Sequence, residues 1–285
     1  MARFARWLAL LMLLPPAVQA CSDVPSTLPT VRSVTPPTVP PSFNEPAYWT
    51  PAPGASWQWQ LSEVPVDLTI EADVYDLDLF DTDPTTIAAL HGRGVHVICY
   101  ISAGSWEDWR PDAGAFPPEV VGKEYEGWPG ESWLDIRRID LLAPIMSARM
   151  GLCREKGFDA VEPDNIDGYA NDTGFPISAG DQLRYNLWLA GEAHSLGLSI
   201  GLKNDPEQVA DLVSAFDWAL VEDCYDQEWC DELAPFLQAG KAVFAAEYID
   251  AVVDFQAACD ELGPSGFSLI LKPRELTAWR QACPP

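Results

Sequence analysis

The chain has 285 residues, of which 43 are acidic and 17 are Lys or Arg, and its formal net charge is −26. A chain this acidic repels nucleic acid and anionic lipid, so we expect neither as a partner. The charge either keeps an exported protein soluble or concentrates a cationic partner, and composition leaves both explanations open.

Residues 1–20 have the pattern of a secretory signal: a basic start, the apolar run WLALLMLL, and small residues before Cys21. Val18-Gln19-Ala20 fits cleavage after Ala20, and the same residues with Cys21 also resemble a bacterial lipobox that would place a lipid on Cys21. The apolar run is too short to span a bilayer, and no later run is longer. We expect a secreted or cell-surface protein that meets a membrane only through a lipid on Cys21.

Residues 21–53 contain nine Pro, five Thr and four Ser, a composition that buries no core and favours an extended stalk. We therefore expect a signal peptide at 1–20, a disordered Pro/Ser/Thr-rich linker at 21–53, and one folded domain at 54–285. The length of that domain suits a single barrel, and we expect a monomer.

Short apolar runs bounded by Gly, Pro, Asn or Asp recur along the domain, as is typical of buried strands. They lie at residues 56–61, 73–80, 95–102, 158–163, 198–203, 217–222, 241–248 and 267–272.

Helical patterns that end in Gly separate most of these runs, and the segment 62–72 has the weakest helical pattern. Strands that alternate with helices predict a parallel sheet, and eight of them are the number that closes a (β/α)8 TIM barrel. A doubly wound open sheet is the alternative, but neither GxGxxG nor GxxxxGK follows the first strand. We expect the α/β class and a single (β/α)8 barrel.

In such a barrel the active site lies at the carboxyl ends of the strands. Polar side chains gather at those ends, and we expect the following to bind substrate: Gln60, Asp78, Tyr100, Glu162, Lys203, Asn204, Glu247 and Tyr248.

Asp164 and Glu222 are the candidate catalytic pair. Because side chains alternate along a strand, Asp164 points as Ala160 does, and Glu222 points as Trp218 does, two strands away. Two carboxylates across a cleft are what glycoside hydrolysis needs, one to protonate the leaving oxygen and one to attack the sugar or activate water. Lys203 would lie between them and would favour the ionised form of Asp164, or would form an ordinary ion pair.

The long segment after the third strand carries Trp106, Trp109, Trp128 and Trp133, which offer flat apolar faces for sugars or simply pack the loop.

Seven Cys are present, and an even set of six remains once Cys21 is set aside. Six Cys allow fifteen pairings, and an exported protein is expected to form disulfides. Proximity in the expected barrel favours Cys99 with Cys153, Cys224 with Cys230, and Cys259 with Cys283.

The segments CYISAGSWEDWRPD, GFDAVEPDNIDGY, GLKND and FDWALVEDC, in that order, resemble the endo-α-1,4-polygalactosaminidase family, glycoside hydrolase family 114. The resemblance extends from about Trp57 to Lys272. It implies a (β/α) barrel that cleaves α-1,4-linked galactosamine polymers with retention. It also implies Asp164 as nucleophile, Glu222 as acid/base, and a cationic amino-sugar polysaccharide as substrate.

Two alternatives stay open at this point. One is a barrel that binds polysaccharide without cutting it, against which the presence of both Asp164 and Glu222 argues. The other is a metal-dependent hydrolase built on Asp76, Asp78, Asp81 and Asp83, although no metal motif is present and we expect no cofactor.

Overall fold

The computed structural model describes residues 48–251 and 254–284, which belong to one compact unit. The predicted signal, the predicted lipidation site at Cys21 and most of the predicted linker lie outside these residues, so the boundaries at 20 and 53 stay predictions. Tyr48 and Trp49, near the end of the predicted linker, stack on His194 and His96.

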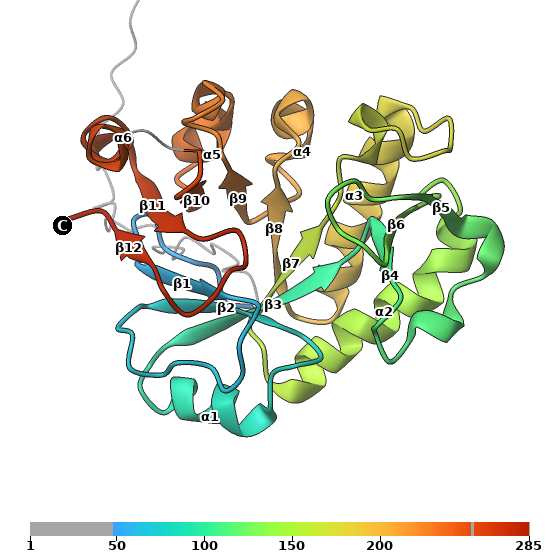
Figure 1. Cartoon of the computed structure of the whole chain (residues 1–285), viewed down its shortest axis with the longest axis horizontal. Helices are drawn as coiled ribbons and strands as arrows, with labels where there is room; N and C mark the ends of the chain where they lie inside the picture. The colour runs from blue at the N-terminus through green and yellow to red at the C-terminus, as the bar shows by residue number, and fades with distance from the viewer. Residues whose placement is uncertain (1–47, 252–253, 285) are drawn as a thin grey trace, which may run out of the picture. The chain divides into compact units, whose positions relative to one another are not determined.

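All eight predicted parallel strands are present, and each pairs in parallel with the next (Figure 1). They are β1 (Trp57–Gln60), β2 (Val74–Asp78), β3 (His96–Ser102), β7 (Ala160–Asp164), β8 (Ser199–Lys203), β9 (Trp218–Glu222), β10 (Val243–Tyr248) and β11 (Phe267–Lys272). A short strand, β12 (Gln281–Ala282), adds to β11 in the antiparallel direction. The α/β class and the barrel order of the strands are confirmed.

The sheet curls until its first and last parallel strands approach each other. Within the described residues no backbone ladder joins β1 to β11, but the Trp57 indole donates a hydrogen bond to the Ser268 carbonyl oxygen at 2.8 Å. Trp57 also packs on Phe244 of β10, with ring centroids 5.0 Å apart. An interior cluster draws apolar side chains from seven of the eight parallel strands, so the curled sheet encloses a packed core.

The Gly in β8 shows how tightly this interior is filled. A Cβ on Gly201 would lie 2.3 Å from the Trp218 ring, so only glycine admits that indole.

Helices cover the outer face of the sheet, over a second apolar core (Figure 1). They are α1 (Pro84–His91), α2 (Ile139–Lys156), α3 (Ala179–Ser195), α4 (Val209–Leu212), α5 (Ala234–Gln238) and α6 (Phe255–Leu262). Asp83 caps α1 before Pro84, and Ser178 forms a capping box with Asp181 at the start of α3. No helix forms between β1 and β2 in residues 61–73, where the helical pattern was weakest.

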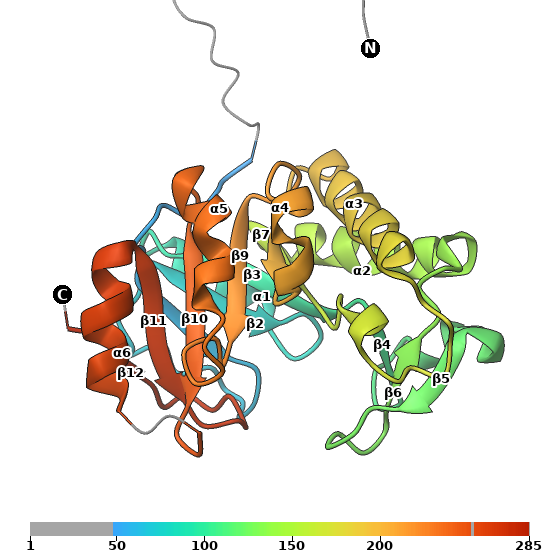
Figure 2. The ribbon, with the colours of Figure 1, turned by 90° about the horizontal axis from the view of Figure 1, so that it is seen from above.

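The segment between β3 and α2 folds into a small antiparallel sheet that the sequence did not predict. It consists of β4 (Ser105–Glu107), β6 (Glu131–Leu134) and β5 (Val121–Glu124), in that order. Figures 1 and 2 both place this sheet on the opposite side of the folded unit from β11 and β12. We call it the side sheet.

None of the described helices has the length and apolar character needed to span a membrane. Three disulfides are present, Cys99–Cys153, Cys224–Cys230 and Cys259–Cys283, which confirms the three expected pairs.

Removing the Cys99–Cys153 disulfide, with both residues replaced by Ala, is expected to lower the free energy of unfolding by about 4 kcal/mol, because the bond closes a loop of 54 residues. Removing Cys224–Cys230, whose loop spans 6 residues, should cost only about 2 kcal/mol. Guanidinium-induced unfolding of the two double variants measures the difference. Equal losses would show that loop closure does not govern the contribution of these bonds.

Candidate active site

A cleft of about 700 Å³ opens at the carboxyl ends of the parallel strands. Its walls come from strand ends, from the side sheet, and from the C-terminal segment that follows β11. Nine acidic side chains line it against three basic ones, Arg110, Lys203 and Arg274. The acids are Asp78, Asp81, Glu107, Glu131, Asp164, Asp167, Glu222, Asp223 and Glu275.

Lys203, the last residue of β8, stands at the centre of the cleft floor. Its Nζ lies 2.7 Å from Glu162, 3.0 Å from Asp164 and 3.1 Å from Glu222. The ammonium also lies 4.7 Å from the centre of the Trp59 ring. Burial alone would lower the pKa of Lys203, but the charges of the three carboxylates raise it well above its ordinary value. The lysine therefore stays charged and holds three carboxylates in fixed positions.

Asp164 ends β7 with both oxygens engaged. Oδ1 accepts from the Asn165 backbone N–H at 2.9 Å and contacts Lys203, and Oδ2 accepts from the Tyr100 hydroxyl at 2.8 Å. Burial, and then the charge of Asp164, raises the pKa of Tyr100 well above its usual range, so its hydroxyl remains a donor. The side chain of Asp164 keeps 20% of its surface exposed, toward the cleft.

Asn165 and Gly104 fix the backbone just after Asp164. Asn165 has a φ of 62°, a conformation that Asn adopts more readily than most residues. Its side-chain amide donates to Ser102, to Ser105 and to Glu131 at 3.0 Å. A Cβ on Gly104 would lie 1.6 Å from the Asn165 carbonyl oxygen, so this close approach requires glycine. Contacts from the side sheet thus fix the backbone at the end of β7.

Glu222 ends β9 on the other side of Lys203. Its Oε1 accepts from the Tyr248 hydroxyl, and the side chain of Asn204 bonds to both the backbone N–H of Glu222 at 3.0 Å and to Oε2 at 3.4 Å. Burial, followed by the charge of Glu222, keeps the pKa of Tyr248 well above its ordinary value. Arg274 stacks over the Tyr248 ring at 4.3 Å and pairs with Asp223.

Two acids of the cleft, Asp167 and Glu131, have pKa values that are raised toward neutrality. Burial, together with the charge of Asp164, raises the pKa of Asp167 to about 6. Burial also raises the pKa of Glu131 to about 7, although its hydrogen bond from Ser105 opposes the shift. Both groups titrate near neutral pH, which makes the charge of the cleft sensitive to pH.

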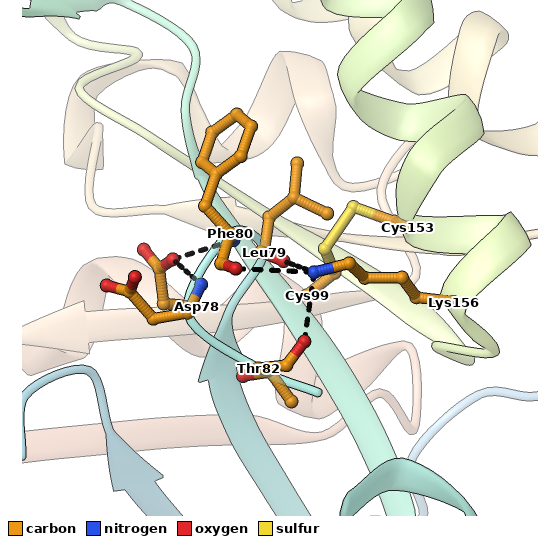
Figure 3. The surroundings of a disulfide bond; sticks show 8 residues. Asp78, Leu79, Phe80, Thr82, Cys99, Cys153 and Lys156 are labelled. Atoms are coloured by element: carbon orange, nitrogen blue, oxygen red, sulfur yellow. Dashed lines mark hydrogen bonds between the residues drawn. A yellow bond between two sulfur atoms is a disulfide. The ribbon is translucent and has the colours of Figure 1, made fainter. Parts of the chain in front are cut away.

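Asp78 lines the cleft but is already paired. Arg110 contacts its Oδ2 at 2.6 Å, and Oδ1 accepts from the backbone N–H groups of Phe80 and Asp81. Figure 3 shows how α2 anchors the same segment: Lys156 donates to the carbonyl oxygens of Leu79, Phe80 and Thr82 beside the Cys99–Cys153 disulfide.

Three predicted substrate-binding residues lie outside the cleft wall. The amide of Gln60 bonds to the backbone of Ser62, Glu63 and Asp67 and shapes that loop. Glu247 is buried and accepts from the backbone N–H groups after Cys224. Glu162 lies below the surface, under Lys203. Their strand positions were assigned correctly, but neighbouring backbone or Lys203 occupies their polar atoms.

The other predicted residues, Tyr100, Lys203, Asn204 and Tyr248, meet at the candidate catalytic pair. Of the four Trp residues considered, Trp109 and Trp128 line the cleft with about half of their surface exposed. Trp106 donates to a backbone carbonyl, and Trp133 packs on Tyr125.

The sequence analysis missed several cleft residues because they come from short strands or loops that the sequence pattern does not mark. Glu131 lies in β6 of the side sheet, Tyr125 directly follows β5, and Arg274 and Leu276 belong to the segment after β11. The sequence could have identified Trp59 as a cleft residue. It lies on β1, where the alternation of side chains predicts which residues point into the barrel.

The four Asp residues of the metal alternative do not converge. Asp76 lies inside the barrel, Asp78 pairs with Arg110, and Asp83 caps α1. Among the described residues the only cluster with metal-ligand spacing combines Glu247 with the disulfide-bonded Cys224 and Cys230, whose sulfurs are no longer thiolates.

Comparison with known proteins now identifies relatives of this arrangement. Residues 38–285 match the profile of glycoside-hydrolase family GH114. The chain is similar to Aspergillus fumigatus Ega3, solved in complex with galactosamine, with 40% identity and a TM-score of 0.78 over 82% of this chain and 97% of that one. It shares the fold of the glycoside hydrolase domain of PelA from Pseudomonas aeruginosa, with 15% identity and a TM-score of 0.63 over 80% of this chain and 99% of that one. No curated protein sequence matches the chain.

Proposed function

Because this chain belongs to glycoside hydrolase family GH114, we propose that it cleaves α-1,4-linked galactosamine polysaccharide within the polymer chain and with retention of configuration. Asp164 acts as the nucleophile, and Glu222 acts as the general acid and then the general base. That the chain is a glycoside hydrolase follows from its family; the substrate, the stereochemistry and the two roles are our proposal.

The shared contact of both carboxylates with Lys203 carries this proposal. Asp164 Oδ1 and Glu222 Oε2 each lie within 3.1 Å of the same Nζ, so they are separated by at most twice that distance, about 6.2 Å. Retaining enzymes place their carboxyl groups about 5–5.5 Å apart, and inverting enzymes need about 6.5–9.5 Å to admit a water. The limit holds for the two oxygens that face Lys203, and it is consistent with direct attack by a carboxylate.

The surroundings of each carboxylate suit its role. Asp164 is held by Tyr100, Asn165 and Lys203, so its oxygens meet the sugar in one orientation. Glu222 is positioned by Tyr248 and Asn204 where it can give a proton to the leaving oxygen and later take one from water.

The charge of the cleft supports a cationic substrate. Nine acids against three bases line it, and the deacetylated amino groups of a galactosamine polymer are positively charged. The similarity to Ega3, whose structure contains galactosamine, points to the same sugar.

We further propose that the protein acts outside the cell as a monomer, released or anchored through Cys21. The three disulfides support an oxidising compartment.

Cleavage of defined polymers tests the proposal. Purified protein should shorten α-1,4-linked galactosamine chains into a range of oligosaccharides, and should act less on the fully N-acetylated polymer. NMR of the first product formed should show the α-anomer, the result that retention requires. Binding without cleavage would favour a non-catalytic barrel, and an initial β-anomer would contradict the nucleophile role.

Replacing Trp128 by Ala is expected to raise KM for long substrates by about three- to tenfold with kcat nearly unchanged, because an exposed indole in the cleft offers a face for the sugar and its ammonium. Trp279 is the matched control, since it is equally exposed but does not line the cleft. Steady-state kinetics on both Ala variants decide whether Trp128 contacts substrate. The same KM for both variants would show that it does not.

A further inference from the structure

Two acids, Asp76 and Glu162, lie inside the barrel beneath the cleft, and both are 0% exposed. Val74 and Ala160, two residues earlier on the same strands, belong to the apolar interior cluster. Side chains alternate along a strand, so Asp76 and Glu162 point into the same interior. No part of the proposed reaction requires an acid at this depth.

Three oxygens of this pair lack a donor. Within residues 48–251 and 254–284, neither oxygen of Asp76 nor Oε2 of Glu162 receives a hydrogen bond, although all three atoms are buried. The two side chains approach each other within hydrogen-bonding reach. Two ionised carboxylates in this position would repel each other without solvent to screen them. A single proton between them removes the repulsion and pairs two of the three oxygens.

Among the described residues, no cation forms an ion pair with Asp76. Lys203 Nζ already contacts Glu162, Asp164 and Glu222, and the groups whose charges act on Asp76 are Glu162, Lys203 and Asp164. With all four carboxylates ionised, this single ammonium would face four negative charges. Burial, and next the charge of Glu162, raises the pKa of Asp76 well above its ordinary value, and burial raises that of Glu162 to about 6.

We infer that Asp76 and Glu162 share one proton in the folded enzyme, and that Asp76 is a positioning residue that keeps the charge of Lys203 directed at Asp164 and Glu222. Protonated Asp76 donates to Glu162 Oε2, and Glu162 Oε1 accepts from Lys203. The Lys203 ammonium then balances the charge of Glu162 and remains available to Asp164 and Glu222. The inference of a shared proton does not depend on the proposed function. The positioning role of Asp76 does rest on the proposed function.

Infrared spectroscopy can detect the shared proton without any substrate, because a protonated carboxyl group has a C=O band that a carboxylate lacks. At about pH 7 the difference spectrum between the wild type and Asp76→Asn should contain a protonated-carboxyl band. The matched control is Asp211→Asn, which removes an exposed Asp from α4 and should change only carboxylate bands. Loss of carboxylate bands alone in Asp76→Asn would overturn the inference.

The pH dependence of stability provides a second test. In the wild type the proton on Asp76 is retained above the pH at which Asp ionises in the unfolded chain, so folding binds a proton and stability falls as pH rises. The Asn side chain does not titrate, so this pH dependence is absent from Asp76→Asn. The stability of Asp76→Asn relative to the wild type should therefore grow between about pH 4 and 7. A difference that stays constant with pH would contradict the shared proton.

Kinetics test the positioning role. Asn can still donate to Glu162, so Asp76→Asn should keep kcat within about threefold of the wild type, whereas Asp76→Leu, which cannot donate, should lower kcat by about tenfold or more with KM nearly unchanged. If Asp76→Leu does not fold, the Asn variant alone decides. A loss of more than about tenfold in kcat for a folded Asp76→Asn, or full activity of a folded Asp76→Leu, would overturn the role.

Discussion

Replacing Asp164 by Asn is expected to lower kcat by about 10⁴-fold or more, because the amide cannot form the covalent glycosyl intermediate. The fold should survive, since the Asn oxygen can still accept from the Asn165 N–H at the position of Oδ1. Steady-state and single-turnover kinetics on the galactosamine polymer, with a thermal melt of each variant, measure both effects.

Asp167→Asn is the matched control for this variant. Asp167 lies three residues later in the same cleft, and its substitution should raise KM rather than abolish turnover. A folded Asp164→Asn variant with near-native kcat would remove Asp164 from the nucleophile role.

Glu222→Gln should separate the second role from the first. With the natural polymer this variant should also lose most of its activity, because the leaving oxygen then departs without a proton. With an aryl galactosaminide, whose leaving group needs no proton, it should still release the aryl alcohol in a first burst. Asp164→Asn should show no such burst, and identical behaviour of the two variants would contradict the division of roles.

The regular part of the fold and the positions of Asp164 and Glu222 were accessible from sequence because both depend on strand periodicity. Alternation predicted that Ala160 points inward, and the structure places it in the interior cluster. The same rule places Asp164 and Glu222 in the cleft, which their contacts with Lys203 confirm as a position though not as a role.

The parts that sequence missed depend on contacts between distant segments. The strands of the side sheet are three or four residues long and are separated by segments that contain Gly and Pro, so no alternation marks them. Glu131 therefore could not be placed against Asn165, and Arg274 could not be placed over Tyr248. Gln60 and Glu247 occupy strand ends as predicted, but nearby loops use their polar atoms.

Replacing Lys203 by Met is the second large effect that we expect. Three carboxylates would lose their shared cation, and Glu162 is 0% exposed, so the variant should lose about 3–5 kcal/mol of unfolding free energy near neutral pH. In the folded fraction of Lys203→Met, kcat should fall by about 10²–10³-fold, because Asp164 and Glu222 no longer share the contact with the Lys203 ammonium.

The pH dependence of that stability loss identifies its cause. Burial raises the pKa of Glu162 to about 6 in the wild type, where the charge of Lys203 opposes the shift. Without Lys203 the pKa of Glu162 rises further, so the folded variant binds a proton that the wild type releases, and the loss of stability grows as pH rises above about 6.

Lys241→Met is the control: this lysine bonds to the carbonyl oxygens of Val213 and Phe216, far from the carboxylate cluster. Its removal should destabilise the protein without that rise and should leave kcat unchanged. A stability loss for Lys203→Met that is equal at pH values on both sides of 6 would show that the ammonium does not balance Glu162.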